Sequence, residues 1–401
     1  MTANTARTAV PSPAAEDGKL PLGALTALTT AAFLTVLTEA LPAGLLPGMS
    51  AGLGVGESAA GQAVTVYAIG SAAAAIPLSV ATARLPRKRL LLTGMAGFAV
   101  ANTVTAFSAH YPLTMAARFL AGVAAGLVWA LLAGYARRIA PVPLRGRAVA
   151  VVMAGIPAAL SLGVPAGTFL GERAGWRAAF WAVTVLAVIL IGWIAALVPD
   201  RPGQASGDRI PVRSALAVPG VVPVLFITLA TVLAHTVLYT YIAAFLARLG
   251  MGDSIDLVLL AFGLASLTAI WIVGVHINRR LRALTLAAVA LFATATTVLA
   301  VTSGTPALVY PAVILWGLGF GGIPALLQTA VAEAAGPAAD TAQAMLVTLW
   351  NIAMAAGGAI GALLLTAAGP SSLPWAVLAL LIPSLIVVTA ARSHGFPARR
   401  P

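Results

Sequence analysis

The strongest constraint on the fold of this chain is a succession of apolar runs separated by short polar turns. A helix needs about 20 apolar residues to cross the hydrocarbon core of a bilayer, and we count twelve runs near that length. Hydrophobic residues make up 60% of the chain and charged residues 8%, whereas soluble domains carry about 25% charged residues. The sequence therefore predicts an all-α membrane protein with twelve transmembrane helices.

The twelve runs divide into two groups of six, because the longest polar connection follows the sixth run. Their approximate limits are 22–46, 61–82, 90–109, 113–135, 148–169, 178–198, 220–246, 257–277, 283–303, 307–331, 344–366 and 374–391. Corresponding basic turns after the second and eighth runs suggest a duplication. The predicted organisation is a disordered cytoplasmic tail (1–20), a six-helix bundle (21–198), a cytoplasmic linker (199–219), a second six-helix bundle (220–392) and a cytoplasmic tail (393–401).

The basic residues indicate an orientation. Nineteen of the 23 Lys and Arg residues fall in the segments that share a side with the N-terminus, and short loops rich in Lys and Arg remain in the cytoplasm. Both termini are therefore expected to be cytoplasmic. The net charge of +12 mostly reflects this bias. We expect a lipid bilayer and no nucleic acid as a partner, since the chain has no solvated domain to carry a nucleic-acid site.

One acidic residue, Glu39, lies inside the first run. A carboxylate at that depth costs about 2.5 kcal/mol or more, so it indicates a functional site, and such an acid can carry a proton. Arg118 is the one basic residue that we place inside a run. At 1.5 Å per residue, both residues lie about 8–10 Å below the outer ends of their helices. We expect an ion pair or a shared water-filled pocket between them.

Two structural interpretations compete with this functional one. Glu39 and Arg118 can form a bridge that only holds two helices together, although buried ion pairs stabilise poorly compared with apolar packing. Arg118 can also extend its charged head to the outer surface while its stem stays in the apolar layer. Trp129 falls on the same helical face as Arg118, and that face is a candidate cavity wall.

The seventh run carries one polar stripe, in which Thr228, Thr231, His235 and Tyr239 recur at spacings of three and four. On a helix of few other polar residues, this stripe should face the protein interior. His235 is a candidate second proton-carrying group. The alternative is a neutral histidine that is hydrogen-bonded to a neighbouring helix.

The second half also offers Gln328, Trp350 and Asn351. A mostly apolar pocket with a few such anchors suits a small amphipathic ligand, although the two amides can instead hold helices together. Three other aromatic residues are more simply interpreted as packing or interfacial residues: Trp271, Trp316 and Phe320.

The sequence contains no phosphate-binding loop, no HExxH motif, no cysteine and no cluster of histidines. These absences argue against an enzyme and against ATP coupling within this chain. We expect no metal and no cofactor. The available energy source is a proton gradient, in which one charge crossing about 100 mV supplies about 2.3 kcal/mol.

Several motifs together support a resemblance to a known family. They are Thr38-Glu39 with Gly44-Leu-Leu-Pro47, Gly61-Gln62 to Tyr67-Ala68, Arg118 with Gly122, Gly163-Val-Pro165-Ala-Gly167, and Gly175-Trp176-Arg177 to Phe180. With them, residues 20–392 resemble the major facilitator superfamily, and within it the bacterial drug:proton antiporters near the sugar-efflux and chloramphenicol-efflux branch. The resemblance implies two pseudo-symmetric six-helix bundles in a bacterial plasma membrane, and a monomer.

The resemblance also implies roles for individual residues. Glu39 would be the protonation site, and Arg118 the arginine of the fourth helix that is tied to proton coupling. Gly163, Pro165 and Gly167 would belong to the antiporter signature of the fifth helix.

The loop after the second run departs from the family pattern of Gly, Asp and Gly among basic residues. Ser79, Ala83 and Pro86 stand at those three places. The basic residues of the loop remain, and we expect them to act in gating: Arg84, Arg87, Lys88 and Arg89. A charge relay through the missing aspartate cannot be assumed.

These observations favour a proton-coupled exporter of small drug-like or amphipathic molecules that works by alternating access. The expected substrate-binding residues are Thr38, Tyr67, Trp129, Thr231, His235, Tyr239, Gln328, Trp350 and Asn351. The alternatives are a proton-linked sugar or metabolite efflux carrier and a membrane sensor that no longer transports. A sugar site should be richer in Asn, Gln and acidic residues than this one.

Overall fold

The computed structural model describes residues 19–203, 210–251, 254–301, 305–392 and 394–396, without the side chains of residues 57, 58 and 256. All regular structure within these ranges is helical, which confirms the all-α class. Most of the two predicted tails, and residues 204–209 of the predicted linker, lie outside the described residues.

The helices follow the apolar runs closely. The first half contains α2 (Leu22–Gly44), α3 (Leu46–Leu53), α4 (Glu57–Ala81), α5 (Arg87–Phe107), α6 (Tyr111–Ile139), α7 (Arg145–Met153), α8 (Gly155–Ala158), α9 (Val164–Ala174) and α10 (Trp176–Leu197). After a short α11 (Val212–Ala217) come α12 (Val221–Thr240), α13 (Ile242–Arg248), α14 (Ile255–Val301), α15 (Val309–Phe320), α16 (Ile323–Ala335), α17 (Ala339–Ala368) and α18 (Ser372–Ala390).

Ten helical stretches of the described chain are long and apolar enough to cross a membrane. Two of them exceed one crossing: 257–301 has 45 residues and 306–368 has 63. Inside α14 the backbone leaves the helical conformation at Arg280 (φ −133°, ψ 31°), in the basic turn where the sequence separates its eighth and ninth runs. The longer stretch holds α15, α16 and α17. The break at Arg280 and the divisions between α15, α16 and α17 are consistent with twelve crossings, and this number stays a prediction.

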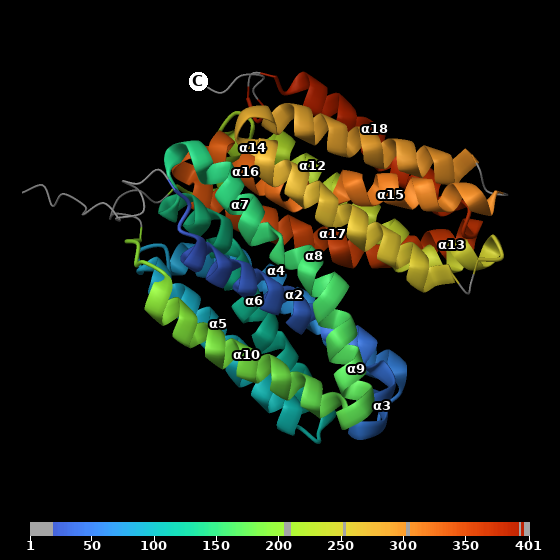
Figure 1. Cartoon of the computed structure of the whole chain (residues 1–401), viewed down its shortest axis with the longest axis horizontal. Coiled ribbons are helices and arrows are strands. Elements are labelled where there is room, and N and C mark those ends of the chain that lie inside the picture. The colour runs from blue at the N-terminus through green and yellow to red at the C-terminus, as the bar shows by residue number, and fades with distance from the viewer. Residues whose placement is uncertain (1–18, 204–209, 252–253, 302–304, 393, 397–401) are drawn as a thin grey trace, which may run out of the picture.

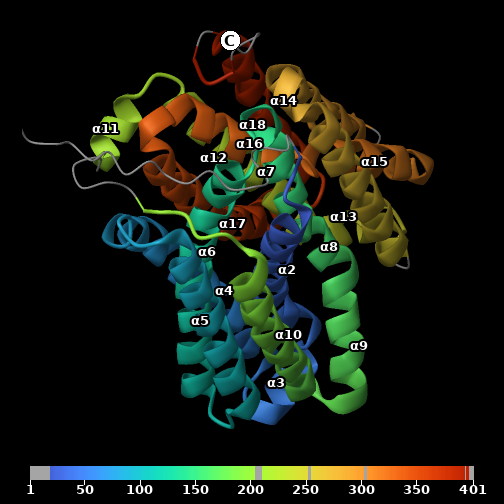
Figure 2. The ribbon, with the colours of Figure 1, turned by 60° about the vertical axis from the view of Figure 1, so that its left-hand side comes forward.

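The helices form two bundles, α2 to α10 and α12 to α18 (Figures 1 and 2). Within the first bundle α4 packs on α6 and α5 on α10, and within the second α14 packs on α15 and α12 on α17. The bundles meet through α4 with α17 and α7 with α14. In Figure 1 they lie together near α7 and α16 and diverge toward α3, α9 and α13.

The fifth run is the most irregular of the first half. It is divided into α7, α8, a π-helical turn at Ala159–Gly163 and α9. Gly155 lies against the backbone of Thr29 and Phe33, and Gly163 lies against the Phe33 ring. A side chain at either glycine would force the fifth run away from α2. The irregular fifth run is thereby held tightly against the helix that carries Glu39.

Candidate functional site

Glu39 lies near the end of α2, one turn before Pro42, which is inside the same helix. The residue is partly exposed, but its Oε1 atom is enclosed and has no hydrogen-bond partner. Burying a carboxylate oxygen without a partner costs free energy, and native structures rarely leave such a group unsatisfied without a functional reason.

Arg118 lies on α6 and is fully buried. Its Nη2 donates a hydrogen bond to the Thr38 carbonyl at 2.7 Å, and its Nε donates to the Ala63 carbonyl at 3.3 Å. The guanidinium lies 5.0 Å from the centre of the Tyr67 ring, a cation–π arrangement. The head group is therefore held between α2, α4 and α6, and the alternative in which it reaches the outer surface is wrong.

The ion pair that the sequence suggested is not formed between Glu39 and Arg118, although the structure describes both side chains. The two groups attract each other electrostatically, but the hydrogen bonds of Arg118 go to main-chain carbonyls. The interpretation of the pair as a structural bridge is therefore wrong for this arrangement. A shared pocket remains the prediction.

Thr38 and Tyr67 pack next to Glu39 and Arg118. Both are fully buried. The Tyr67 hydroxyl donates to the Thr35 carbonyl at 3.0 Å, and the Thr38 hydroxyl accepts from the Asn102 amide at 3.3 Å. Neither side chain offers a free surface to a substrate here. Trp129, one of the expected cavity residues on α6, is partly exposed.

In the second half, His235 belongs to a set of contacting rings from four helices, some stacked and some tilted. We call this set the aromatic cluster, and its members are His235, Tyr239, Phe262, Trp316, Phe320 and Trp350. The His235 and Phe320 rings are nearly parallel, with centroids 3.6 Å apart and an interplanar angle of 5°. The His235 Nδ1 atom is enclosed without a hydrogen-bond partner. No hydrogen bond joins the His235 ring to another helix of the described residues, so the alternative of a neutral histidine hydrogen-bonded to a neighbouring helix is wrong for this arrangement.

Trp316 and Phe320 are buried packing residues, as the sequence suggested, and they pack against His235. Trp316 is fully buried, and its centroid lies 5.4 Å from that of His235. A signal was present, because these residues are four apart on one helix and share a face. Trp271, by contrast, is largely exposed, at 69%.

The polar side chains of the second half are mostly engaged. The Thr228 and Thr231 hydroxyls donate to carbonyls of their own helix, and both residues are fully buried, so the predicted stripe does face the interior. The Asn351 amide donates to the Val347 carbonyl at 2.9 Å. The Gln328 Nε2 lies 2.9 Å from Met153 Sδ, across the interface between the halves.

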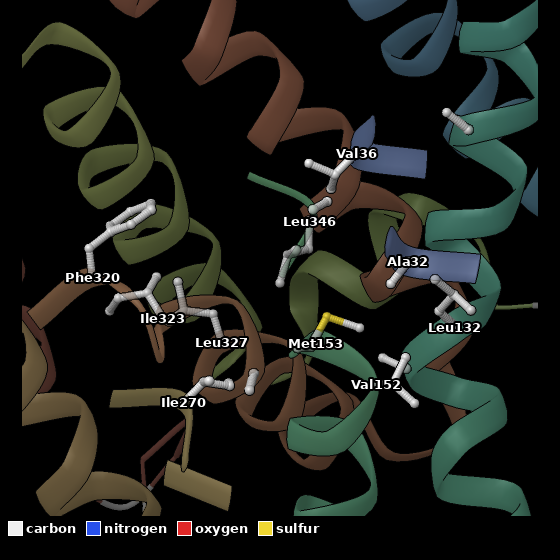
Figure 3. Close-up of a cluster of buried hydrophobic side chains, with 14 of the residues drawn as sticks. Ala32, Val36, Leu132, Val152, Met153, Ile270, Phe320, Ile323, Leu327 and Leu346 are labelled. Atoms are coloured by element: carbon white, nitrogen blue, oxygen red, sulfur yellow. The ribbon is translucent and has the colours of Figure 1, made fainter. Parts of the chain in front are cut away.

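A group of buried apolar side chains, which we call the apolar floor, lies where the two halves meet. Figure 3 shows its side chains, which point toward one another from both halves. The first half contributes Ala32, Val36, Leu132, Val152 and Met153, and the second half contributes Ile270, Phe320, Ile323, Leu327 and Leu346. Close-packed apolar side chains leave no room for water, so water is excluded from the floor itself.

Ion pairs also join the halves. Asp340, in the first turn of α17, pairs with Arg87 of α5. The same Asp340 Oδ2 atom lies 2.9 Å from Nη2 of Arg138 of α6. Arg137 lies 3.6 Å from Glu333 of α16. All three of these pairs link the first bundle to the second, and they form what we call the arginine gate.

Of the four basic residues expected to act in gating, only Arg87 forms an ion pair with the second bundle among the described residues. Arg87 begins α5 rather than lying in a loop, and its side chain is only 6% exposed. Lys88 donates to the Ala195 carbonyl of its own half at 2.7 Å, while Arg84 and Arg89 are exposed. The acid that pairs with Arg87 is therefore Asp340, on the opposite side of the interface.

Sequence reasoning missed that acid, although a signal existed. Beyond residue 256 the chain contains only two acidic residues, Glu333 and Asp340. Both flank the turn between the tenth and eleventh runs, on the side where the basic residues gather.

The sequence model of the Major Facilitator Superfamily matches residues 28–358. The chain belongs to the major facilitator superfamily. This confirms the resemblance, and it makes the protein a multi-pass membrane transporter of small molecules rather than an enzyme.

Curated relatives of this facilitator include efflux proteins. A probable sugar efflux transporter of Mannheimia succiniciproducens is 28% identical over 337 residues, which cover 82% of this chain and 84% of the relative. The purine ribonucleoside efflux pump NepI of Escherichia coli K12 is 28% identical over 357 residues, which cover 88% and 90%.

Solved facilitator structures share the fold. The proton:xylose symporter XylE matches with a TM-score of 0.76 at 14% identity, over 92% of this chain and 94% of that one. The human organic anion transporter MFSD10 matches with a TM-score of 0.75 at 16% identity, over 92% and 100%. FucP, solved in the outward conformation, matches with a TM-score of 0.72 at 14% identity, over 93% and 99%.

Proposed function

We propose that this facilitator exports small drug-like or amphipathic molecules in exchange for protons, with Glu39 as the protonation site and Arg118 as its coupling partner. One observation carries the proposal. The Glu39 carboxylate has an enclosed oxygen without a hydrogen-bond partner, while Arg118 is held nearby by main-chain carbonyls. A carboxylate that is not consumed by a fixed bridge is available to take up and release a proton.

The transport cycle follows from the two ends of the molecule. The arginine gate and the apolar floor hold the halves together toward the end that we assign to the cytoplasm. A proton arriving from the other side would neutralise Glu39 and weaken its attraction to Arg118 and to the bound substrate. Opening of the gate would then release the proton inward and reset the site. The protein would work as a monomer in the cytoplasmic membrane of a bacterium, without a cofactor.

A second candidate is proton-linked efflux of a sugar or another metabolite. The curated relatives favour it, since one is a probable sugar efflux transporter and another a purine ribonucleoside efflux pump. The same Glu39 and Arg118 would couple either substrate to protons, so the candidates differ in the ligand and not in the proton step.

Proteoliposomes that contain a pH-sensitive dye test the proposal. Lipophilic drugs, nucleosides and sugars are added in turn to wild type and to Glu39→Gln. We expect at least one compound to trigger proton movement in wild type and none to do so in the variant, because glutamine keeps the shape of the side chain but cannot exchange a proton.

Glu172→Gln is the matched control, since it makes the same change at an exposed position of α9. It should transport as wild type does. Full proton-driven transport by Glu39→Gln would refute the mechanism. No response of wild type to any compound would favour a membrane sensor that does not transport.

A further inference from the structure

The aromatic cluster has a covered back and a partly open front. Trp316 and Phe262 are buried behind, whereas His235, Tyr239 and Trp350 are partly exposed. Phe320 joins the two layers: its ring stacks on His235 and its centroid lies 6.4 Å from that of Trp350. Phe320 is also a member of the apolar floor, where the two halves meet (Figure 3). The front of the cluster is therefore formed by ring faces and ring edges.

Two ring nitrogens of the cluster have no hydrogen-bond partner, Nδ1 of His235 and Nε1 of Trp316. Trp316 is fully buried, and buried polar groups are almost always bonded. Rings that serve only as packing would be expected to bond such nitrogens to neighbouring helices. Both nitrogens are enclosed and Trp316 lies in the covered back of the cluster, so a ligand would reach them only after the rings rearrange.

The neighbouring polar side chains offer little to a sugar. The Asn351 amide donates to its own helix, the Gln343 amide donates to the Gln328 carbonyl at 2.7 Å, and the Gln328 amide lies against Met153 Sδ. The Thr231 hydroxyl is likewise bonded within α12. A carbohydrate needs a hydrogen-bond partner for each hydroxyl that leaves water, whereas these side chains already donate within the protein and the Oε1 atoms of Gln328 and Gln343 are enclosed.

We propose that the substrate carries a flat aromatic or heteroaromatic ring, which stacks in the aromatic cluster beside His235, Phe320 and Trp350. The proposal rests on the proposed export function and names the substrate class of that same site. Offset stacking and edge-to-face contacts, together with burial of the ring area, supply the recognition. The half of the substrate outside the cluster then extends toward the first bundle.

Matched ligand pairs test this without any proton gradient. Binding is measured by calorimetry on the detergent-solubilised protein with phenyl and cyclohexyl β-D-glucoside, and with uridine and 5,6-dihydrouridine. Each pair keeps the sugar and changes a flat ring into a puckered one. D-glucose alone is the third arm. Because an aromatic contact contributes about 0.5–1.5 kcal/mol beyond area burial, we expect an aromatic member to bind about two- to tenfold tighter than its partner.

Variants of the cluster connect the binding to these rings. Phe320→Leu should weaken binding of the aromatic member by about two- to tenfold, whereas Phe320→Tyr, which keeps a ring, should restore it. His235→Phe keeps the stacking and removes Nδ1, so it separates ring contact from hydrogen bonding. Phe98→Leu is the matched control, because Phe98 is a buried ring of α5 in the first half.

Several outcomes overturn the proposal. They are equal binding of both members of each pair, binding of D-glucose as tight as that of the glucosides, no binding by either aromatic member, and no difference between Phe320→Leu and Phe98→Leu. Failure of the export function is distinguishable: proton movement driven by a sugar would refute the ring proposal and keep antiport. Ring binding without any proton movement would do the reverse.

Discussion

The two halves of this transporter pack by the same device but place different chemistry at their centres. In the first half, Gly122 lets α6 approach the backbone of α4 at Tyr67, and in the second, Gly317 lets α15 approach α14 at Phe262. Next to the first contact lies the guanidinium of Arg118, and next to the second lie the Phe262 and Trp316 rings, in tilted contact. Close helix approach through glycine therefore supports a charged centre in one half and an apolar, aromatic one in the other.

The difference suggests a division of labour. A charge in a low-dielectric interior responds strongly to the gain or loss of another charge nearby, which suits proton coupling. Ring faces respond to shape and area and only weakly to a distant charge, which suits substrate recognition. We infer that the first half senses the proton and the second half senses the substrate, with the arginine gate joining them.

Removal of the buried charge is expected to have the largest effect. In Arg118→Met the carbonyls of Thr38 and Ala63 lose a charged donor and Glu39 loses its nearest positive charge. Hydrogen bonds to charged groups contribute about 1.5–3 kcal/mol each, so we expect a stability loss of about 3 kcal/mol or more and no proton-linked export. Chemical unfolding in detergent and the dye assay measure the two effects.

Arg118→Lys sharpens the same test. Lysine keeps the charge, but one ammonium on a flexible stem does not reproduce the two-sided hydrogen bonding of a guanidinium. We expect stability between that of wild type and Arg118→Met, and impaired coupling. Ring binding should survive in both variants. Proton-linked export by Arg118→Met at the wild-type rate would break the division between the halves.

Loss of Asp340 tests the connection between the halves. Asp340→Asn removes the charge that Arg87 and Arg138 share, and a shift of about 1–2 kcal/mol would change the open population about 5–30-fold. The chain has no cysteine, so Leu346→Cys provides a single thiol in the apolar floor. We expect Asp340→Asn to speed its labelling by a soluble maleimide.

The matched control for the gate is Asp200→Asn. Asp200 lies at the same end, but it accepts hydrogen bonds from the backbone N–H groups of Lys88 and Arg201, all within the first half of the chain. Labelling of the thiol should stay close to that of Leu346→Cys alone. Equal acceleration by both aspartate variants would show that charge at this end, and not the pairs that cross the interface, keeps the gate closed.

The sequence predicts the helices well because length and hydrophobicity are properties of one run at a time. The run expected at 178–198 is α10, Trp176–Leu197, and the run expected at 90–109 is α5, Arg87–Phe107. It also places Glu39 and Arg118 near each other, because depth follows from helical rise. What depth cannot reveal is that main-chain carbonyls, which every residue carries, take the hydrogen bonds of Arg118.

The aromatic cluster and the arginine gate could not be predicted from the sequence, because both depend on which helices are neighbours. Trp316 and Phe320 gain their meaning from His235 on another helix, and a single-helix pattern does not say which neighbour a face meets. The partner of Arg87 is Asp340, more than 250 residues away. Glu333 and Asp340 point to such pairs only when the loops are sorted by side of the membrane and the acidic residues of one half are matched with the basic residues of the other.

The last test of the comparison uses the two glycines that open it. A Cβ at Gly122 would meet the Tyr67 carbonyl, and one at Gly317 would meet that of Phe262. Overpacking costs about 1–3 kcal/mol, so each alanine variant should be less stable. Gly192→Ala is the control, since it has open space around it and should be neutral or stabilised by up to about 1 kcal/mol.

The functional consequences of the two glycine variants should differ even where the stability losses match. Gly122→Ala displaces Tyr67 and with it the seat of Arg118, so proton-linked export should fall while binding of the aromatic glucoside is kept. Gly317→Ala moves α15 away from Phe262, so ring binding should weaken in detergent, where no gradient acts. If both variants lose both properties equally, the halves act as one site, and the shared packing device matters more than the different chemistry it supports.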